Sequence, residues 1–257
     1  MTHSIMSPNR FKRVIHLLIP PVIWLGVWQF AAMAVHMELK LPTPLAVIRA
    51  LSVLVFQSLF WQSAAASLAR IFLGILCGAT LGTLLAVLTT SSAWANRLLS
   101  PLIRVIRATP VISFILLVWL WVSRAQVPTV ISALMVLPVV WGNVSKGVAQ
   151  TDPLLLELAR AYRFGRWKTL RLIYAPSVRP YFTSGLDTAM GLAWKSGVAA
   201  EAICLPALAL GSQIYYAKLY LESPDLFAWT AVVIALSRGL ETLVARLLRT
   251  PQREVAA

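Results

Sequence analysis

Several apolar runs in this sequence are long enough to cross a lipid bilayer, and they constrain the fold more than any other feature. A transmembrane helix needs about 20 predominantly apolar residues. The chain has 257 residues, of which 59% are apolar and 12% charged, whereas about 25% of residues are charged in soluble proteins. No separate water-soluble domain is visible, so the sequence predicts an all-α membrane protein with six transmembrane helices. The candidate spans are 14–33, 64–88, 98–122, 127–148, 181–205 and 226–248.

The third candidate span is the least regular of the six. Pro101, Arg104, Arg107 and Pro110 crowd its first half, which leaves 111–122 as its uninterrupted apolar stretch. Prolines within the other spans are expected to mark kinks, because neighbouring helices can satisfy the backbone groups that proline leaves unpaired.

The distribution of Lys and Arg predicts the orientation of the chain. Sixteen of these bases fall in segments on the side of the N-terminus and four in segments on the opposite side. Cytoplasmic segments carry the excess of bases in membrane proteins, so both termini are expected in the cytoplasm. This divides the chain into a tail at 1–13, a six-span membrane domain at 14–248 and a tail at 249–257. The net charge of +14 then faces anionic lipid, and no nucleic-acid partner is predicted.

The N-terminal run has a second interpretation. A basic start, an apolar run and the small residues around Ala32-Met33-Ala34 also fit a cleavable secretion signal. The length of the run and its Trp and Pro content favour an uncleaved first span.

Three glycines in the second span form a regular pattern. Gly74, Gly78 and Gly82 recur at intervals of four residues, which places them on one face of a helix. Small residues at this spacing allow two helices to approach closely. The face is therefore a packing surface, either within the chain or between two copies of it.

A basic segment lies in the predicted cytoplasmic connection between the fourth and fifth spans. Thr151-Asp152-Pro153 is typical of a helix start, with a capping side chain and a proline in the first turn. Gly165 is well placed to end that helix. An amphipathic segment, 166–174, follows and leads to Pro176. A short charged helix that projects from a membrane domain is expected to dock on another protein.

The same segment resembles the cytoplasmic loop of permease subunits of ATP-binding-cassette (ABC) importers. Glu157-Leu158-Ala159 is followed by Arg163, Ile173 and Pro176 at the intervals of that family's loop. Leu158 replaces an alanine of the family pattern, and Arg163 occupies the position of its glycine. The stretches LPTPLAVIRAL, SLARIFLGILCGATLG and GLAWKSGVAAEAI are similar to the nitrate, sulfonate and taurine type of importer permease.

The resemblance implies a type I ABC importer permease fold in a bacterial plasma (inner) membrane. It implies a homodimeric pore for a small solute, an extracytoplasmic solute-binding protein and two ATPase subunits. The cytoplasmic loop at 149–180 would couple the pore to these ATPases, and ATP would be used by the partner subunits with no cofactor bound by this chain. The coupling residues implied are Glu157, Ala159, Arg163, Gly165, Ile173 and Pro176.

The sequence lacks the motifs of an enzyme or of a nucleotide-binding subunit. It contains no Gly-x-x-x-x-Gly-Lys-Ser/Thr phosphate loop, no Gly-x-Ser-x-Gly and no His-Glu-x-x-His. The Cys and His residues have no metal-ligand spacing, so no metal site is predicted. The energy for transport must come from another chain or from an ion gradient. A secondary transporter is therefore the main alternative, and a membrane-embedded enzyme is the third.

Ionisable residues inside the spans are candidates for the translocation pathway, because such residues are costly in lipid. Arg70, Lys195 and Glu201 are the three candidates. Arg70 and Lys195 would give the pathway a positive potential, which suits a small anion such as a sulfonate, taurine or nitrate. The alternative is that these residues form interhelical ion pairs, or that the Arg70 side chain extends to the outer surface of the membrane. Lys195 also lies at a spacing that allows a pair with Asp187.

Overall fold

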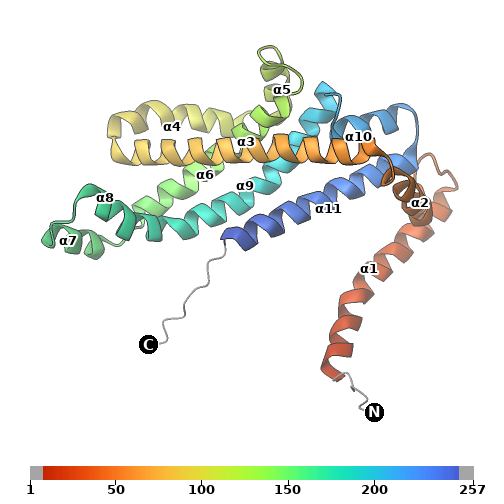
Figure 1. The fold of residues 1–257 in the computed structure, drawn as a ribbon, viewed down its shortest axis with the longest axis horizontal. Coiled ribbons are helices and arrows are strands. Elements are labelled where there is room, and N and C mark those ends of the chain that lie inside the picture. The colour runs from red at the N-terminus through yellow and green to blue at the C-terminus, as the bar shows by residue number, and fades with distance from the viewer. Residues whose placement is uncertain (1–7, 249–257) are drawn as a thin grey trace. The chain divides into compact units, whose positions relative to one another are not determined.

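The computed structural model of the protein describes residues 8–248, with side chains from residue 19 to residue 247. The predicted C-terminal tail and residues 1–7 of the predicted N-terminal tail lie outside this range, whereas residues 8–13 belong to the first helix. In the described part of the chain every regular element is helical (Figure 1). The elements are α1 (Pro8–Val35), α2 (Pro44–Leu54), α3 (Ser58–Ser91), α4 (Ala93–Ala108), α5 (Val111–Trp119), α6 (Val127–Ala149), α7 (Pro153–Ala161), α8 (Arg166–Thr169), the π-helix η1 (Leu170–Tyr174), α9 (Ala175–Cys204), α10 (Leu210–Leu219) and α11 (Ser223–Leu248).

Three of these helices meet the length and composition expected of a membrane span. They are α3, α6 and the segment Ser223–Leu247 of α11, and the bent pair formed by α4 and α5 makes a fourth if it is one broken span. The helix α9 has 30 residues but carries three charged residues, Asp187, Lys195 and Glu201, in its apolar part. By these criteria the described residues do not establish the predicted count of six.

The predicted third span, 98–122, is not a single helix. The chain bends by 105° between α4 and α5, at Thr109-Pro110. Thr109 has extended backbone angles, φ −77° and ψ 133°, because the ring of a following proline disfavours the helical conformation at this position. Pro110, one of the two prolines in the first half of this predicted span, therefore separates the basic helix α4 from the apolar helix α5.

The described chain divides into two compact units, of which the larger comprises residues 61–212 and 233–248. Its centre is the pair α6 and α9, which pack extensively against each other. Glycines permit the close approach: a Cβ at Gly185 would lie 2.8 Å from the Cβ of Asn143, and one at Gly147 would lie 2.9 Å from the Tyr181 ring.

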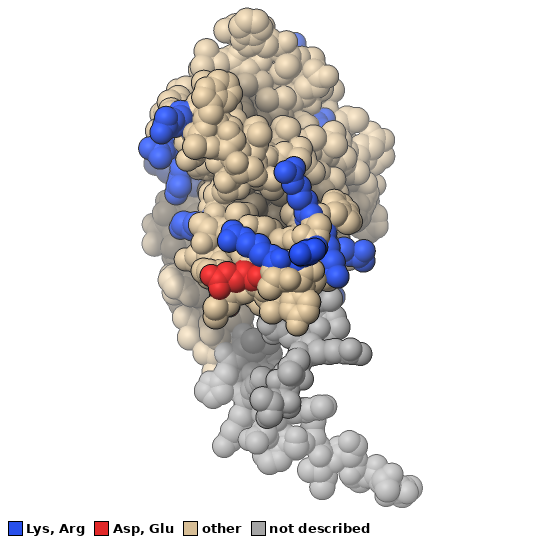
Figure 2. Space-filling model, turned by 90° about the vertical axis from the view of Figure 1, so that its left-hand side faces the viewer, with Lys and Arg blue, Asp and Glu red and all other residues tan. Residues whose placement is uncertain are grey.

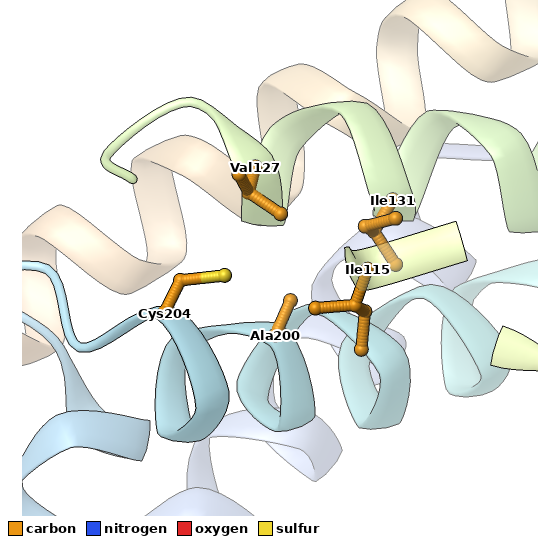
Figure 3. Packing of buried hydrophobic residues seen from close by; sticks show 5 residues of the cluster. All are labelled: Ile115, Val127, Ile131, Ala200 and Cys204. Carbon is orange, nitrogen blue, oxygen red and sulfur yellow. The ribbon is translucent and has the colours of Figure 1, made fainter. Parts of the chain in front are cut away.

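A buried apolar cluster ties α5 to this pair. Ile115 of α5, Val127 and Ile131 of α6, and Ala200 and Cys204 of α9 are almost completely inaccessible and point toward one another (Figure 3). Burial of such side chains stabilises a fold by about 25 cal/mol per Å² of apolar surface where water is the reference solvent. In lipid the stabilisation comes from close packing between helices. The small side chains of Ala200 and Cys204 allow the helices to pack closely.

The smaller unit comprises, among the described residues, 8–60 and 213–232, and aromatic contacts hold it together. The indole N–H of Trp28 donates to the carbonyl of Pro42 at 3.0 Å, and its ring lies 5.8 Å from that of Phe227. Phe60 stacks on Trp229 with ring centroids 5.3 Å apart. These contacts join the helices near the N-terminus to the beginning of α11.

Candidate functional site

The predicted coupling loop folds into a short helix with well-defined ends. The Asp152 carboxylate accepts a hydrogen bond from the Leu154 N–H at 2.9 Å, and Pro153 occupies the first turn of α7. An acidic N-cap satisfies an amide that the helix leaves unpaired and favours the positive end of the helix dipole. The helix start expected from the sequence is confirmed.

The end of α7 differs from the prediction, because Arg163 and not Gly165 makes the turn. Arg163 has φ 51°, its N–H donates to the Arg160 carbonyl at 3.0 Å, and the Phe164 N–H donates to the Ala159 carbonyl at 2.8 Å. These two bonds form a Schellman motif, which requires a left-handed residue at this position. Gly165 has φ −64° and begins α8, so its backbone needs no glycine. Arg163 thus adopts the conformation that a glycine would adopt most easily.

The coupling residues divide into a buried and an exposed set. Ala159 and Ile173 are buried, whereas Glu157, Arg163, Gly165 and Pro176 are exposed. The buried pair anchors the loop from two of its segments. The exposed set is available to another protein.

Large apolar side chains are also exposed on this loop. Leu154 and Leu158 lie one turn apart on α7, and Trp167 lies on α8. Figure 2 shows Lys and Arg side chains gathered on the face of the molecule that carries α7 and α8, with few acidic ones. Apolar anchors surrounded by charge are typical of protein-binding surfaces.

A π-helix connects the loop to α9. The Ala175 N–H donates to the carbonyl of Leu170, five residues earlier, at the end of η1. Pro176 has no N–H, and its ring would clash with the carbonyl four residues before it in a regular α-helix. The wider π-turn accommodates this proline and continues the helix into α9.

A buried charge network lies at the other end of α9. The Glu201 side chain has 0% exposure, and its ion pair with the Arg70 guanidinium of α3 is 3.1 Å long. Ser67 of α3 donates to the same carboxylate at 2.8 Å, as does the Gly211 N–H of α10 at 3.2 Å. The Glu201 carboxylate is therefore shared by three helices.

The same network satisfies the irregular backbone between α9 and α10. Arg70 also donates to the carbonyl of Leu208, the Ser67 hydroxyl accepts from the Leu210 N–H at 2.9 Å, and the Ser212 hydroxyl donates to the carbonyl of Pro206 at 2.8 Å. Non-helical backbone within a membrane protein requires such internal partners. Gly211 is needed here because a Cβ would lie 2.3 Å from the carbonyl oxygen of Val198.

The structure therefore separates the three pathway candidates. Arg70 and Glu201 form the interhelical ion pair that was the alternative to a pathway role, and Ser67 and Gly211 complete it without having been singled out from the sequence. Lys195 is exposed and has no ion-pair or hydrogen-bond partner among the described residues. The pair between Lys195 and Asp187 that their spacing allows is not formed. A further ion pair joins Arg238 to Glu241 at 3.8 Å.

The three regularly spaced glycines lie against α6 of the same chain. A Cβ at Gly74, Gly78 or Gly82 would lie 2.4, 2.5 or 2.7 Å from a carbonyl oxygen of α6. No larger residue fits without a shift of the backbone. The two alternatives left open by the sequence thus resolve, at these positions, to a contact within the chain.

The fold and this loop define a helical membrane transport subunit, and sequence comparison identifies its family. Residues 71–249 match the family described as "Binding-protein-dependent transport system inner membrane component". Because the match covers more than half of the chain, the protein belongs to this family. It is the permease component of a binding-protein-dependent ABC importer, a transport subunit and not an enzyme. Membership of this family argues against the alternative hypothesis, a secondary transporter driven by an ion gradient.

Individual relatives agree with this assignment. The chain is 26% identical to the putative aliphatic sulfonates transport permease protein SsuC of Bacillus subtilis, over 91% of this chain and 84% of the relative. It is 25% identical to the taurine transport system permease protein TauC of Escherichia coli, over 86% of this chain and 83% of the relative. A nitrate import permease protein, NrtB of Leptolyngbya laminosa, is 32% identical over 56% of this chain and 52% of its own length.

Solved structures share the fold. An ABC transporter that imports the acidic polysaccharide alginate superposes with a TM-score of 0.64 at 14% identity, over 95% of this chain and 98% of the other. An amino acid ABC transporter superposes with a TM-score of 0.61 at 19% identity, over 77% and 94%. The predicted fold class, an all-α importer permease, is confirmed.

Proposed function

We propose that this subunit forms, as a homodimer, the membrane pathway for a small anion. Relatives of the chain are named for the transport of sulfonates, taurine, bicarbonate and nitrate, which are anions or carry an anionic group. The anion passes from an extracytoplasmic solute-binding protein through the pore, and two ATPase subunits supply the energy. This chain binds no cofactor of its own.

The pathway follows the exposed face of α9. Ser184, Thr188 and Lys195 are exposed and lie within about 60° of one another around the helix axis, since each residue turns an α-helix by about 100°. A charged side chain in a membrane helix requires a water-filled cavity or a protein neighbour. A pore between two copies supplies such a cavity, and Lys195 there attracts an anion.

Coupling to the ATPase subunits takes place through α7, and the geometry of this helix carries the proposal. Its acidic N-cap and its Schellman turn fix both ends, while Leu154, Glu157 and Leu158 remain exposed between them. A short helix held at both ends transmits a displacement of the ATPase to α9 through η1. Both termini and this loop lie on the cytoplasmic side of the bacterial inner membrane, in accordance with the excess of bases there.

Affinity purification of the tagged chain from its native membranes tests this coupling. We expect an ATPase subunit in stoichiometric amount with the natural chain and its loss with Glu157→Lys, which reverses an exposed charge on α7. Glu222→Lys makes the same change at an exposed carboxylate outside the loop and should retain the ATPase. A chain that purifies without any ATPase would contradict the proposal, as would equal retention by Glu157→Lys.

A further inference from the structure

The basic helix α4 carries a surface to which the proposed function assigns no role. Its sequence contains Arg97, Arg104 and Arg107 and no acidic residue. All three arginines are exposed, and in the described part of the chain none of them has a hydrogen-bond or ion-pair partner. Three exposed guanidinium groups on 16 residues of helix are available to an anionic partner.

An exposed apolar stripe runs beside these arginines. Trp94, Leu98, Leu102 and Val105 are all exposed, Trp94 to 73%, and they fall within about 80° of arc around the helix axis. Their spacing of four, four and three residues keeps them on one face. The stripe is a continuous apolar surface on a helix whose other side, with Ala95 and Ile103, is buried.

Two of the arginines, Arg97 and Arg104, line one edge of that stripe. Arg97 and Arg104 are seven residues apart and lie within about 20° of each other, about 60–80° from Trp94 around the axis. Arg107 lies about 140° from Trp94, on the side of the helix that faces away from the stripe. An apolar face with Trp and Leu, bordered by Arg, is typical of a helix that lies at a membrane–water interface.

The length of the neighbouring helix places this edge at the membrane surface. The 34 residues of α3 extend about 51 Å, whereas the hydrocarbon core is about 30 Å thick. About 21 Å of α3, summed over its two ends, therefore extends beyond the hydrocarbon. One residue, Ser92, separates α3 from α4, which runs back along it (Figure 1). The start of α4, with Trp94 and Arg97, can therefore lie at the membrane surface, and Arg104 can reach that surface along its apolar stem while the apolar stripe contacts lipid.

The bend after α4 supports the same placement. The last arginine, Arg107, precedes the 105° bend by two residues. Beyond the bend α5 is Val-Ile-Ser-Phe-Ile-Leu-Leu-Val-Trp, with no charged residue. The chain therefore changes direction at the boundary between a basic amphipathic helix and a purely apolar one.

We propose that this face of α4 is a binding site for anionic phospholipid of the inner leaflet. Arg97 and Arg104 hold headgroup phosphates, and the stripe from Trp94 to Val105 contacts the first part of the acyl chains. Arginine suits a phosphate because its planar fork of N–H groups donates two parallel hydrogen bonds. The leaflet is assigned from the orientation given under the proposed function, but the lipid preference itself is independent of that orientation.

Fluorescence quenching of Trp94 tests the proposal. The transporter, with its ATPase partner, is placed in nanodiscs that contain phosphatidylglycerol or phosphatidylcholine brominated on the acyl chains. The chain has ten tryptophans, so the contribution of Trp94 is obtained as the difference from Trp94→Phe. We expect brominated phosphatidylglycerol to quench this contribution at least about threefold more than brominated phosphatidylcholine at equal mole fraction, since each arginine at an anionic surface adds up to about a fivefold preference.

Two sets of substitutions distinguish a local site from general charge attraction. R97Q/R104Q/R107Q should reduce the preference to about one, whereas R166Q/K168Q/R171Q removes three bases from α8 and η1 and should leave it unchanged. If the first triple variant does not fold, Arg104→Gln alone should lower the preference part of the way. An equal response to both lipids in the natural chain would overturn the proposal, as would a loss of preference in both triple variants.

Two further outcomes are informative about the surroundings of α4. Absence of quenching by either lipid would show that protein covers the stripe, in a second copy or in the ATPase, and would also overturn the proposal. Labelling of a cysteine at Ser91, in a chain with Cys77→Ala and Cys204→Ala, by an impermeant maleimide reports the side of the membrane. Labelling from the outside of intact cells would contradict the proposed orientation and would leave the phospholipid preference standing on the quenching ratio.

Discussion

Arg70 of α3 and Glu201 of α9 form an ion pair of 3.1 Å in which the carboxylate has no exposed surface and the guanidinium side chain is 19% exposed. Arg70→Met would leave Glu201 buried without its counter-charge, although Ser67 and Gly211 would still donate to it. Removal of one partner of a buried pair costs about 3–5 kcal/mol. We expect a large decrease in the thermal midpoint of the purified subunit, measured by the loss of its monodisperse size-exclusion peak.

The exposed pair in the same unit provides a matched control. The Arg238 and Glu241 side chains lie 3.8 Å apart, and that of Arg238 is 82% exposed. Exposed pairs contribute about 0–1 kcal/mol, so Arg238→Met should change the thermal midpoint little. Similar decreases in Arg70→Met and Arg238→Met would show that burial of Glu201 does not determine the importance of its pair.

A reversal of the buried pair should fail to restore it. In Arg70→Glu with Glu201→Arg the opposite charges remain, but an arginine at 201 cannot accept a hydrogen bond. The N–H of Gly211 and the hydroxyl of Ser67 would then lose the acceptor that holds α10 against α9. We expect the double variant to melt at or below the temperature of either single variant. Recovery to within a few degrees of the natural chain would mean that charge alone determines the interaction.

Local signals in the sequence predicted the coupling helix, but the partner of Glu201 could not be inferred from them. The start of α7 depends on Asp152 and Pro153, which are adjacent to the helix that they begin. The spacing of charges along α9 excludes a pair between Lys195 and Glu201, since six residues turn a helix by about 240° net. It carries no information about Arg70, which lies 131 positions away.

The prediction that Gly165 ends α7 is wrong because it rests on residue type alone. Glycine is the residue most often found in the left-handed conformation, so Gly165 was the natural choice. The hydrogen bonds of the Arg163 and Phe164 amides determine the turn instead. Arg163 can adopt the left-handed conformation that this turn requires, because its side chain is not β-branched. The bend at Pro110 was visible as an irregularity in the third span, but its size of 105° depends on how α4 and α5 pack on α6.

The glycine face of α3 should not tolerate even one additional methyl group. In Gly78→Ala the new Cβ would lie 2.5 Å from the carbonyl oxygen of Ala133, and this oxygen cannot move without the backbone of α6. Overpacking of this kind costs about 1–3 kcal/mol. Gly239→Ala, on α11, meets no atom within 4 Å and should be neutral or stabilising by up to about 1 kcal/mol, because alanine favours a helix. The thermal midpoints of the two variants should therefore shift in opposite directions or differ by several degrees, and an unchanged midpoint for Gly78→Ala would contradict the close contact.

The left-handed backbone of Arg163 leads to a prediction that separates conformation from charge in the coupling loop. A left-handed residue other than glycine costs roughly 1–2 kcal/mol, so Arg163→Gly should preserve the Schellman turn and slow proteolysis of the loop. Arg163→Val should disrupt the turn, because a β-branched residue is strongly disfavoured at positive φ. Gly165→Ala should be tolerated, since φ −64° suits any residue. Limited proteolysis and co-purification of the ATPase check all three variants: if α7 is the docking element, the ATPase is retained by Arg163→Gly and Gly165→Ala and lost with Arg163→Val. Loss with both Arg163→Gly and Arg163→Val, together with retention by Gly165→Ala, would instead assign the contact to the arginine side chain and not to the shape of the turn.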